Sequence, residues 1–130
     1  MVRWKGWASV CIVGCGGIAR LHAGFRRDGK VTLYGCDIDL SRAEALMAEF
    51  GGAGVFQNYQ DVLQREDIQI VDICLPHHLH REVAVAALEA GKHVLLEKPI
   101  ADTLEAADAI LESAAEAQGK FMVAECWRFY

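Results

Sequence analysis

The most chemically suggestive residues of this sequence follow directly on a short apolar run. Residues 94–96 are Val-Leu-Leu, and Glu97, Lys98 and Pro99 come immediately after them. If the apolar run is a buried strand, Lys98 lies at its carboxyl end, where open α/β sheets bind their ligands. The carboxylate of Glu97 would then offset part of the cost of burying an ammonium group. The alternative is a surface lysine with its stem on apolar surface, followed by a turn proline. We also expect the Lys98–Pro99 bond to be cis.

A glycine-rich turn follows the first apolar run, residues 8–13. The segment VGCGGIA contains the pattern G-x-G-x-x-A at Gly14, Gly16 and Ala19. The first glycine permits a tight turn, the second lets the backbone approach a pyrophosphate, and the alanine lets the next helix pack closely on the strand. The helix N-terminus would offer its free N–H groups to the phosphates. Because the pattern lies between a predicted strand and a predicted helix, it indicates a dinucleotide-binding turn.

An acidic residue follows the second apolar run, residues 31–36. Asp37 stands about 20 residues after the glycine turn, where dinucleotide-binding folds place the acid that binds the adenosine ribose hydroxyls. A carboxylate there would repel a 2′-phosphate, which favours NAD over NADP. Arg42 keeps NADP possible, because its guanidinium could pair with that phosphate. Alternatively, Asp37 or Asp39 caps the next helix, an interpretation that we favour for Asp39.

Three histidines follow the fourth apolar run. They are His77, His78 and His80, directly after Pro76. Histidines at this spacing on one helix supply two metal ligands, and no carboxylate or cysteine completes a set, so we expect no metal. A surface or cofactor-lining role is the alternative.

The composition excludes several classes of protein. Hydrophobic residues make up 53% of the 130 residues, and the net charge is −5. The basic residues are scattered, which argues against a nucleic-acid surface, and no apolar run is long enough to span a membrane. The five cysteines are odd in number and lack metal-ligand spacing, as expected of small apolar residues in a reducing cytoplasm. The N-terminus lacks the apolar region of a secretory signal, so we expect a cytoplasmic protein.

Short apolar runs alternate with longer amphipathic ones along the whole chain. The runs are mostly continuous rather than alternating, which is typical of strands covered on both faces of a parallel sheet. The predicted strands are residues 8–13, 31–36, 55–56, 68–75, 93–96 and 121–124, and the predicted helices are 17–27, 42–50, 58–63, 78–90 and 103–118. The alternation predicts one doubly wound α/β domain, a Rossmann fold of three layers with strand order 3-2-1-4-5-6.

The motifs in this order resemble the glucose–fructose oxidoreductase and inositol 2-dehydrogenase group, the Gfo/Idh/MocA family. The resemblance covers nearly the whole chain. It rests on VGCGGIARLHA, CDID, VDICLPHHLH, ALEAGKHVLLEKPIADTLEAAD and MVAECWRF. The most specific part is residues 88–99.

The resemblance implies a role for each matching residue. Lys98 resembles the family's catalytic lysine, which orients the substrate hydroxyl. The implied cofactor contacts are Gly14, Gly16, Gly17 and Ile18 at the pyrophosphate, Asp37 at the adenosine ribose, Leu75, Pro76 and His80 along the middle, Glu97 at the nicotinamide ribose, and Lys98 and Arg128 near the nicotinamide. Three positions depart from the family pattern. Leu75 stands where a Thr or Ser is common, so only its backbone could bind the ribose, and His77 and Cys126 each replace a usual residue.

Family members continue for about 200 further residues, an ordinary domain size, into a second domain that supplies the substrate pocket and the general base. We therefore expect residues 1–130 to be the dinucleotide-binding domain of a dehydrogenase for a sugar or cyclitol hydroxyl, inactive without that second domain. The alternative is a non-catalytic NAD(P)-binding or regulatory module. A methyltransferase-type fold would not explain Glu97-Lys98-Pro99. Aromatic residues at the C-terminus, Trp127, Phe129 and Tyr130, predict self-association.

Overall fold

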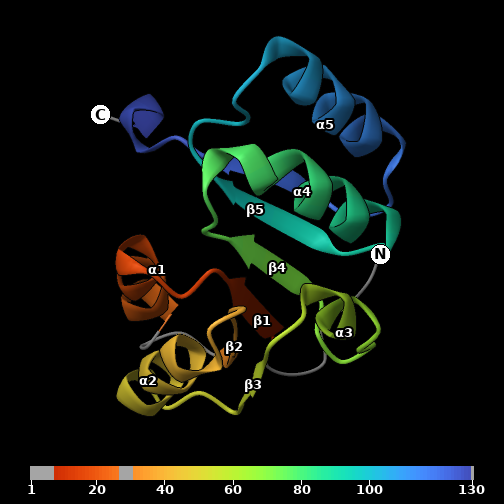
Figure 1. The fold of residues 1–130 in the computed structure, drawn as a ribbon. Coiled ribbons are helices and arrows are strands. Elements are labelled where there is room, and N and C mark those ends of the chain that lie inside the picture. Colours follow the sequence, from red (N-terminus) through yellow and green to blue (C-terminus); the bar gives the residue numbers. More distant parts are fainter. Residues whose placement is uncertain (1–7, 27–30, 130) are drawn as a thin grey trace.

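The part of the chain that the structure describes forms a six-stranded parallel sheet (Figure 1). The computed structural model describes residues 8–26 and 31–129, with the side chains of 25, 26, 128 and 129 outside the description. The strands are β1 (Ala8–Val13), β2 (Val31–Cys36), β3 (Gly54–Phe56), β4 (Ile70–Ile73), β5 (His93–Glu97) and β6 (Phe121–Ala124). Their spatial order is β3-β2-β1-β4-β5-β6, which confirms the predicted order.

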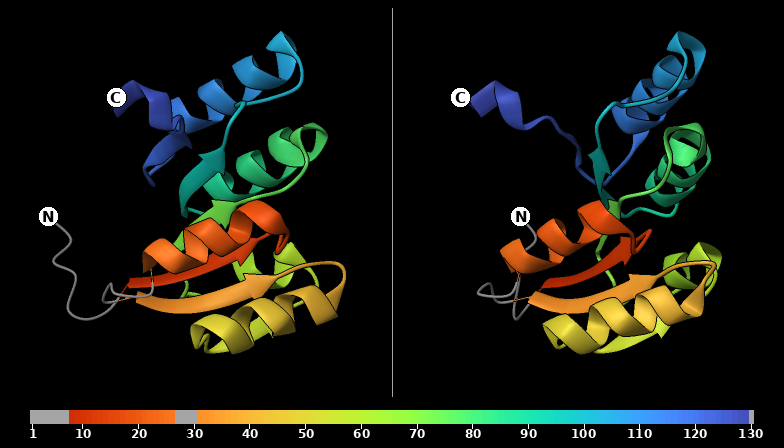
Figure 2. Two further views of the ribbon diagram at one scale, coloured as in Figure 1. Left: turned by 90° about the vertical axis from the view of Figure 1, so that its left-hand side faces the viewer. Right: turned by 60° about the vertical axis from the view of Figure 1, so that its left-hand side comes forward.

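Helices cover both faces of the sheet. They are α1 (Gly17–Arg26), α2 (Leu40–Phe50), α3 (Tyr59–Leu63), α4 (His80–Glu89) and α5 (Leu104–Glu116), with short 3-10 turns η1 (His77–Leu79) and η2 (Cys126–Phe129). Figure 2 shows α1 and α2 on one face and α4 and α5 on the other. The three-layer arrangement that the sequence predicts is confirmed.

The central strand β1 contributes side chains to two separate hydrophobic cores. Val10 and Ile12 pack with the buried residues of α1 and α2. Cys11 and Val13 pack with those of α3, α4 and α5. Successive side chains of a strand point to opposite faces, so a strand covered on both sides must be apolar at every position. This is why the apolar run of β1 is continuous and why its predicted bounds are confirmed.

The first residues of two helices differ from the predicted bounds. The side chain of Asp39 accepts a hydrogen bond from the Ser41 backbone N–H, so α2 begins two residues earlier than predicted. Thr103 caps α5 by accepting from the Ala106 N–H at 3.1 Å. In both places neighbouring residues have capping side chains, and local spacing alone does not decide which of them adopts the extended backbone of a cap.

Other local expectations have mixed outcomes. Strand β4 is shorter than predicted, because Ile68 and Leu75 lie in the connections on either side of it. The cysteines at 11, 15, 36 and 74 are buried and unbridged, whereas Cys126 is exposed. Among the described residues, no helix is long and apolar enough to cross a membrane.

Candidate functional site

The carboxyl ends of β1, β2, β4 and β5 lie along one edge of the sheet, and the residues singled out by the sequence follow these ends. The glycine turn follows β1 and Asp37 follows β2. Leu75 and Pro76 come after β4, and Lys98 comes after β5. The parallel topology therefore gathers segments that are far apart in the sequence.

Gly14 makes the tight turn that the sequence predicts. Its φ of +94° lies in the region that L residues rarely adopt. A Cβ at this position would stand 2.6 Å from the Cys74 carbonyl oxygen on the neighbouring strand connection. Its N–H donates to the Cys36 carbonyl at 2.8 Å. Only glycine lets the β1 exit pass this close to the β4 exit.

The rest of the glycine turn opens towards solvent. Gly16 and Gly17 are exposed, and a Cβ at either would meet no atom within 4 Å. Ile18 is 42% exposed, whereas Ala19 on α1 is fully buried in the core with Val10 and Ile12 of β1, as the packing role of the motif requires. Because α1 begins at Gly17, its first N–H groups have no helical partner. This open glycine backbone at a helix N-terminus can accommodate a pyrophosphate.

Asp37 ties the glycine turn to the end of β2. One carboxylate oxygen accepts from the Cys15 N–H at 2.9 Å and the other from the Asp39 N–H at 2.8 Å. These two bonds fix the carboxylate at the rim of the site. The Cys15 thiol beneath it is inert, because burial raises its pKa to about 11.

Asp39 has a different role from Asp37. It is the N-cap of α2, and hydrogen bonds from Ser41 hold the pKa of its carboxyl below the usual range. Its other oxygen lies 3.6 Å from the Arg42 Nε. The capping interpretation is thus confirmed for Asp39, and the Arg42 guanidinium already has a carboxylate beside it.

A cavity of about 720 Å³ lies against these segments. It brings together six of the residues singled out in the sequence, namely Gly14, Gly16, Asp37, Arg42, Leu75 and Pro76. The sequence analysis did not identify the β3 end as part of it. Gln57 and Asn58 line the cavity there, beside Ile38, whose side chain is 86% exposed. The signal was weak because β3 is only three residues long.

Glu97 and Lys98 behave differently at the end of β5. The Glu97 side chain is 13% exposed, and its Oε2 accepts from the Lys98 backbone N–H at 2.9 Å. Lys98 is exposed, and its ammonium has no hydrogen-bond or ion-pair partner among the described residues. The Lys98–Pro99 bond is cis, which confirms the expectation.

His80 supports the site from below. Its side chain is fully buried, with Nε2 at 3.0 Å from the Leu75 carbonyl oxygen and Nδ1 at 2.9 Å from that of Pro99. The ring thus joins the β4 exit to the β5 exit. The ring is fully buried and holds these two backbone segments, and its expected contact with the cofactor stays a prediction.

The remaining predicted residues are also placed. His77 and His78 are exposed on η1. Arg128 lies on η2, and its side chain is outside the described residues, so its predicted contact stays a prediction.

The sequence analysis missed His22, which lies on α1 beneath the site. Its Nδ1 stands 2.9 and 3.0 Å from the two carboxylate oxygens of Asp72, and its Nε2 stands 2.9 Å from the Glu97 Oε1. The hydrogen bond to Asp72 is the main cause that raises the pKa of His22, against the opposing effect of burial. The available signal was Asp72 itself, an acid inside the apolar strand β4.

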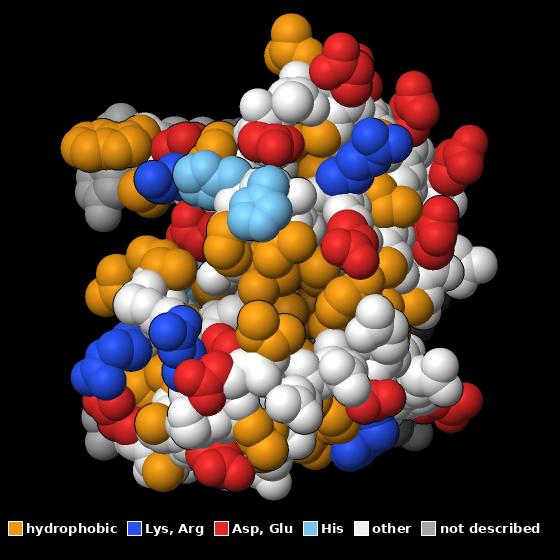
Figure 3. All heavy atoms as spheres, viewed as in Figure 1, with side chains coloured by type: hydrophobic (Ala, Val, Ile, Leu, Met, Phe, Trp, Pro, Cys, Tyr) orange, Lys and Arg blue, Asp and Glu red, His pale blue; other side chains and the backbone are white. Residues whose placement is uncertain are grey.

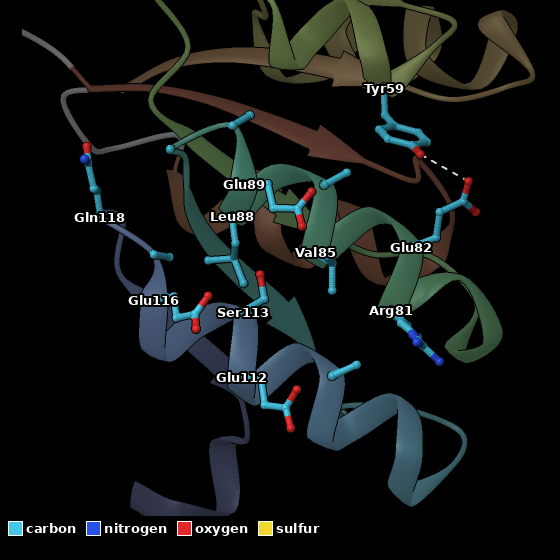
Figure 4. Close-up of a pocket in the computed structure, with 15 residues that line it drawn as sticks. Tyr59, Arg81, Glu82, Val85, Leu88, Glu89, Glu112, Ser113, Glu116 and Gln118 are labelled. Carbon is cyan, nitrogen blue, oxygen red and sulfur yellow. Dashed lines mark hydrogen bonds between the residues drawn. The ribbon is translucent and has the colours of Figure 1, made fainter.

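A larger hollow of about 910 Å³ lies away from the strand ends, between α4 and α5 (Figure 4). Acidic side chains gather over these two helices (Figure 3). The charged residues lining the hollow are Arg81, Glu82, Glu89, Glu112 and Glu116. Tyr59 donates to Glu82 at 3.2 Å across its rim. Four carboxylates against one guanidinium disfavour an anionic dinucleotide, so the cavity at the strand ends is the better candidate.

Comparison with known proteins identifies the family to which the chain is similar. The sequence profile described as "Oxidoreductase family, NAD-binding Rossmann fold" matches residues 8–125. D-glucoside 3-dehydrogenase of Escherichia coli is 38% identical over 109 residues, which cover 81% of this chain and 31% of that protein. Inositol 2-dehydrogenase of Rubrobacter xylanophilus is 33% identical, over 94% of this chain and 36% of that protein.

Solved structures show the same similarity. A levoglucosan dehydrogenase in complex with NADH superposes with a TM-score of 0.85 at 28% identity, over 93% of this chain and 35% of that one. Apo scyllo-inositol dehydrogenase from Lactobacillus casei gives a TM-score of 0.88 at 28% identity, over 97% and 38%. The chain thus spans roughly a third of the length of these relatives.

Proposed function

Because the chain belongs to the oxidoreductase family with an NAD-binding Rossmann fold, we propose that it serves hydride transfer between a nicotinamide cofactor and a sugar or cyclitol hydroxyl. Its role as an NAD-binding domain follows from the family, and the reaction and substrate class are the proposal. The substrates named for its relatives support that class, because glucosides, inositols and levoglucosan are all polyhydroxylated rings.

The observation that carries the proposal is the open glycine turn beside the fixed Asp37 carboxylate. The cradle fits a dinucleotide because Gly14 occupies a position where a Cβ would collide with backbone, while Gly16 and Gly17 leave free space at a helix N-terminus. Asp37 borders the same cavity and can accept from ribose hydroxyls. We place the adenosine half along this cavity, with the exposed Ile38 side chain against the base.

We propose NAD in preference to NADP. Two backbone N–H groups hold the Asp37 carboxylate in place. The carboxylate therefore cannot turn away from a 2′-phosphate and would repel it. Arg42, the group that could compensate, lies beside the Asp39 carboxylate. We expect Asp37→Asn to reduce the preference for NADH over NADPH by about tenfold, the effect of one charge-assisted hydrogen bond. An unchanged ratio of the two dissociation constants, measured by fluorescence titration, would contradict this assignment.

Lys98 is our candidate for the catalytic residue. When bound, the nicotinamide accepts or returns the hydride. In the oxidation direction the carbinol carbon gives up its C–H electron pair as hydride, and the hydroxyl gives up its proton to a general base. The exposed ammonium of Lys98 would donate to the substrate oxygen and stabilise it as the carbonyl forms. We assign no base among the described residues, so we expect this chain to bind the cofactor with little turnover by itself.

Calorimetric titration with NADH tests the cofactor site. Gly16→Ala should keep the fold, because a Cβ there meets no atom within 4 Å, yet weaken NADH binding by about tenfold or more by blocking the pyrophosphate. Gly24→Ala is the matched control on α1, where the nearest non-local atom to the new Cβ is a Phe50 ring carbon at 3.9 Å. Equal affinities of the two variants would refute the placement of the pyrophosphate.

A further inference from the structure

Three ionisable side chains from three elements form one buried network beneath the reactive end of β5. His22 comes from α1, Asp72 from β4 and Glu97 from β5. The ring of His22 lies between the two carboxylates, with one nitrogen facing each. Asp72 is fully buried, and the side chains of His22 and Glu97 are 11% and 13% exposed. Water therefore screens these charges weakly.

Each ring nitrogen of His22 faces a carboxyl group, and with both carboxyl groups ionised this arrangement favours a protonated ring. An ionised carboxylate only accepts hydrogen bonds, so a ring that faces a carboxylate with each nitrogen donates from both and is an imidazolium. The Cys74 sulfur lies 3.6 Å from Nδ1. Burial and the nearby carboxylate of Asp72 raise the pKa of this thiol, so it stays neutral. One positive charge is thus held between two negative ones.

His22, Asp72 and Cys74 each offer one potential metal-ligand atom, and these three atoms lie within 4.8 Å of one another. This spacing could also suit a metal ion. The contacts favour the hydrogen-bonded network. Separations of 2.9 and 3.0 Å between the ring nitrogen and the carboxylate oxygens are direct hydrogen-bond lengths.

The network continues to the backbone of the lysine. Glu97 accepts from His22 through Oε1 and from the Lys98 N–H through Oε2, at 2.9 Å each. On the far side of Lys98, His80 holds the Pro99 carbonyl at 2.9 Å. The backbone at Lys98 is therefore fixed on both sides, while its ammonium remains exposed.

We propose that His22 is a positioning residue: as an imidazolium anchored on Asp72, it orients Glu97 and, through it, sets the backbone from which Lys98 projects. Both oxygens of Glu97 are engaged by this role, which differs from the direct contact with the nicotinamide ribose expected from the sequence. The inference rests on the proposed function only where it assigns Lys98 to the substrate. The network itself can be tested without cofactor.

The test is a pH titration of the ¹⁵N-labelled chain by NMR, following the ring nitrogens of His22 and the backbone amide of Lys98. We expect both ring nitrogens to remain protonated at pH values above the ordinary histidine pKa of about 6.5, because the two carboxylates raise the pKa of the ring. The Lys98 amide resonance should move with the same midpoint as the ring. A role in packing alone would not couple a lysine amide to the ionisation of a distant histidine.

Two variants complete the test. Glu97→Gln removes one of the two charges that face the ring but leaves the buried contact with Asp72, so the chain should fold. We expect the titration midpoint of His22 to fall by about one pH unit, a tenfold loss of proton affinity, and the Lys98 amide to lose its coupling. His78→Gln, at an exposed histidine, is the control and should change neither signal.

Two results would overturn the proposal: titration of His22 at the ordinary value, or a Lys98 amide that does not respond when the ring titrates. Failure of NADH to bind in the calorimetric experiment would instead count against the proposed function and would leave this network unaffected.

Discussion

The two glycines of the turn should respond in opposite ways to the same substitution, Gly→Ala. At Gly14 the new methyl group would stand 2.6 Å from the Cys74 carbonyl oxygen and 2.8 Å from its carbon, and φ is +94°. These neighbours are backbone atoms, so they cannot rotate away as a flexible side chain would. The exits of β1 and β4 would have to separate.

The magnitude follows from two costs. Holding an L residue in a sparsely populated backbone region lowers the stability of the fold by about 1–3 kcal/mol. Forcing an extra methyl group into a filled site lowers it by about 1–3 kcal/mol more. We expect Gly14→Ala to lower the free energy of unfolding by about 2–6 kcal/mol, a large part of the stability of a small domain. Gly16→Ala should change it by less than about 0.5 kcal/mol, because its Cβ meets no atom within 4 Å.

Urea denaturation followed by circular dichroism measures both values, with the slope m as a check that the unfolding transition is comparable. NADH affinity is measured on the same samples. The reasoning predicts that Gly14→Ala loses stability and that Gly16→Ala keeps stability but loses affinity. A Gly14→Ala variant as stable as the unmodified chain would refute the close approach of the two strand exits.

Three further predictions concern other parts of the structure. The pKa of His22 is raised on folding, so the stability that this residue contributes is fully present below about pH 6.5 and is lost as pH rises through the pKa of the folded state. Urea denaturation at a series of pH values should show this decline in the free energy of unfolding. In the Glu97→Gln variant the decline should be smaller. Lys92 is buried, and its ammonium donates to two backbone carbonyl oxygens at 2.6 and 2.8 Å. Lys92→Met should therefore lower the free energy of unfolding, measured by heat or urea, by about 1–3 kcal/mol. An unchanged free energy of unfolding would show that water replaces the ammonium at the two carbonyl oxygens. Trp127 is 77% exposed, so we expect concentration-dependent self-association by light scattering that Trp127→Ser reduces, whereas a monomer at every concentration would contradict this.

Local patterns predicted most of the scaffold, because the strands are continuous apolar runs and the central ones are buried on both faces. The bounds of β1, β2 and β6 follow from continuous apolar runs, and Gly14 and Asp37 follow from a motif whose spacing reflects one strand–turn–helix unit. Such features depend on residues close in sequence. They are therefore visible before any tertiary contact is known.

The network beneath the site could not be predicted in the same way. His22, Asp72 and Glu97 are separated by about 50 and 25 residues and meet only because β4 and β5 are neighbours and α1 crosses their ends. His80 shows the same limit, since its position after the β4 exit did not indicate that its ring is buried between two backbone carbonyls. The first residues of α2 and α5 were misplaced by two residues and one residue, because adjacent polar side chains can each cap a helix and the backbone conformation decides between them.

The central claim is that the dinucleotide binds at the carboxyl ends of the strands and not in the acidic hollow between α4 and α5. Chemical-shift mapping of backbone amides during titration with NADH tests it most directly. We predict that the largest changes occur at Gly16, Asp37 and Lys98, while Glu112 and Ser113 in the acidic hollow stay unchanged. Changes centred on α4 and α5, or no saturable change at millimolar NADH, would contradict the claim.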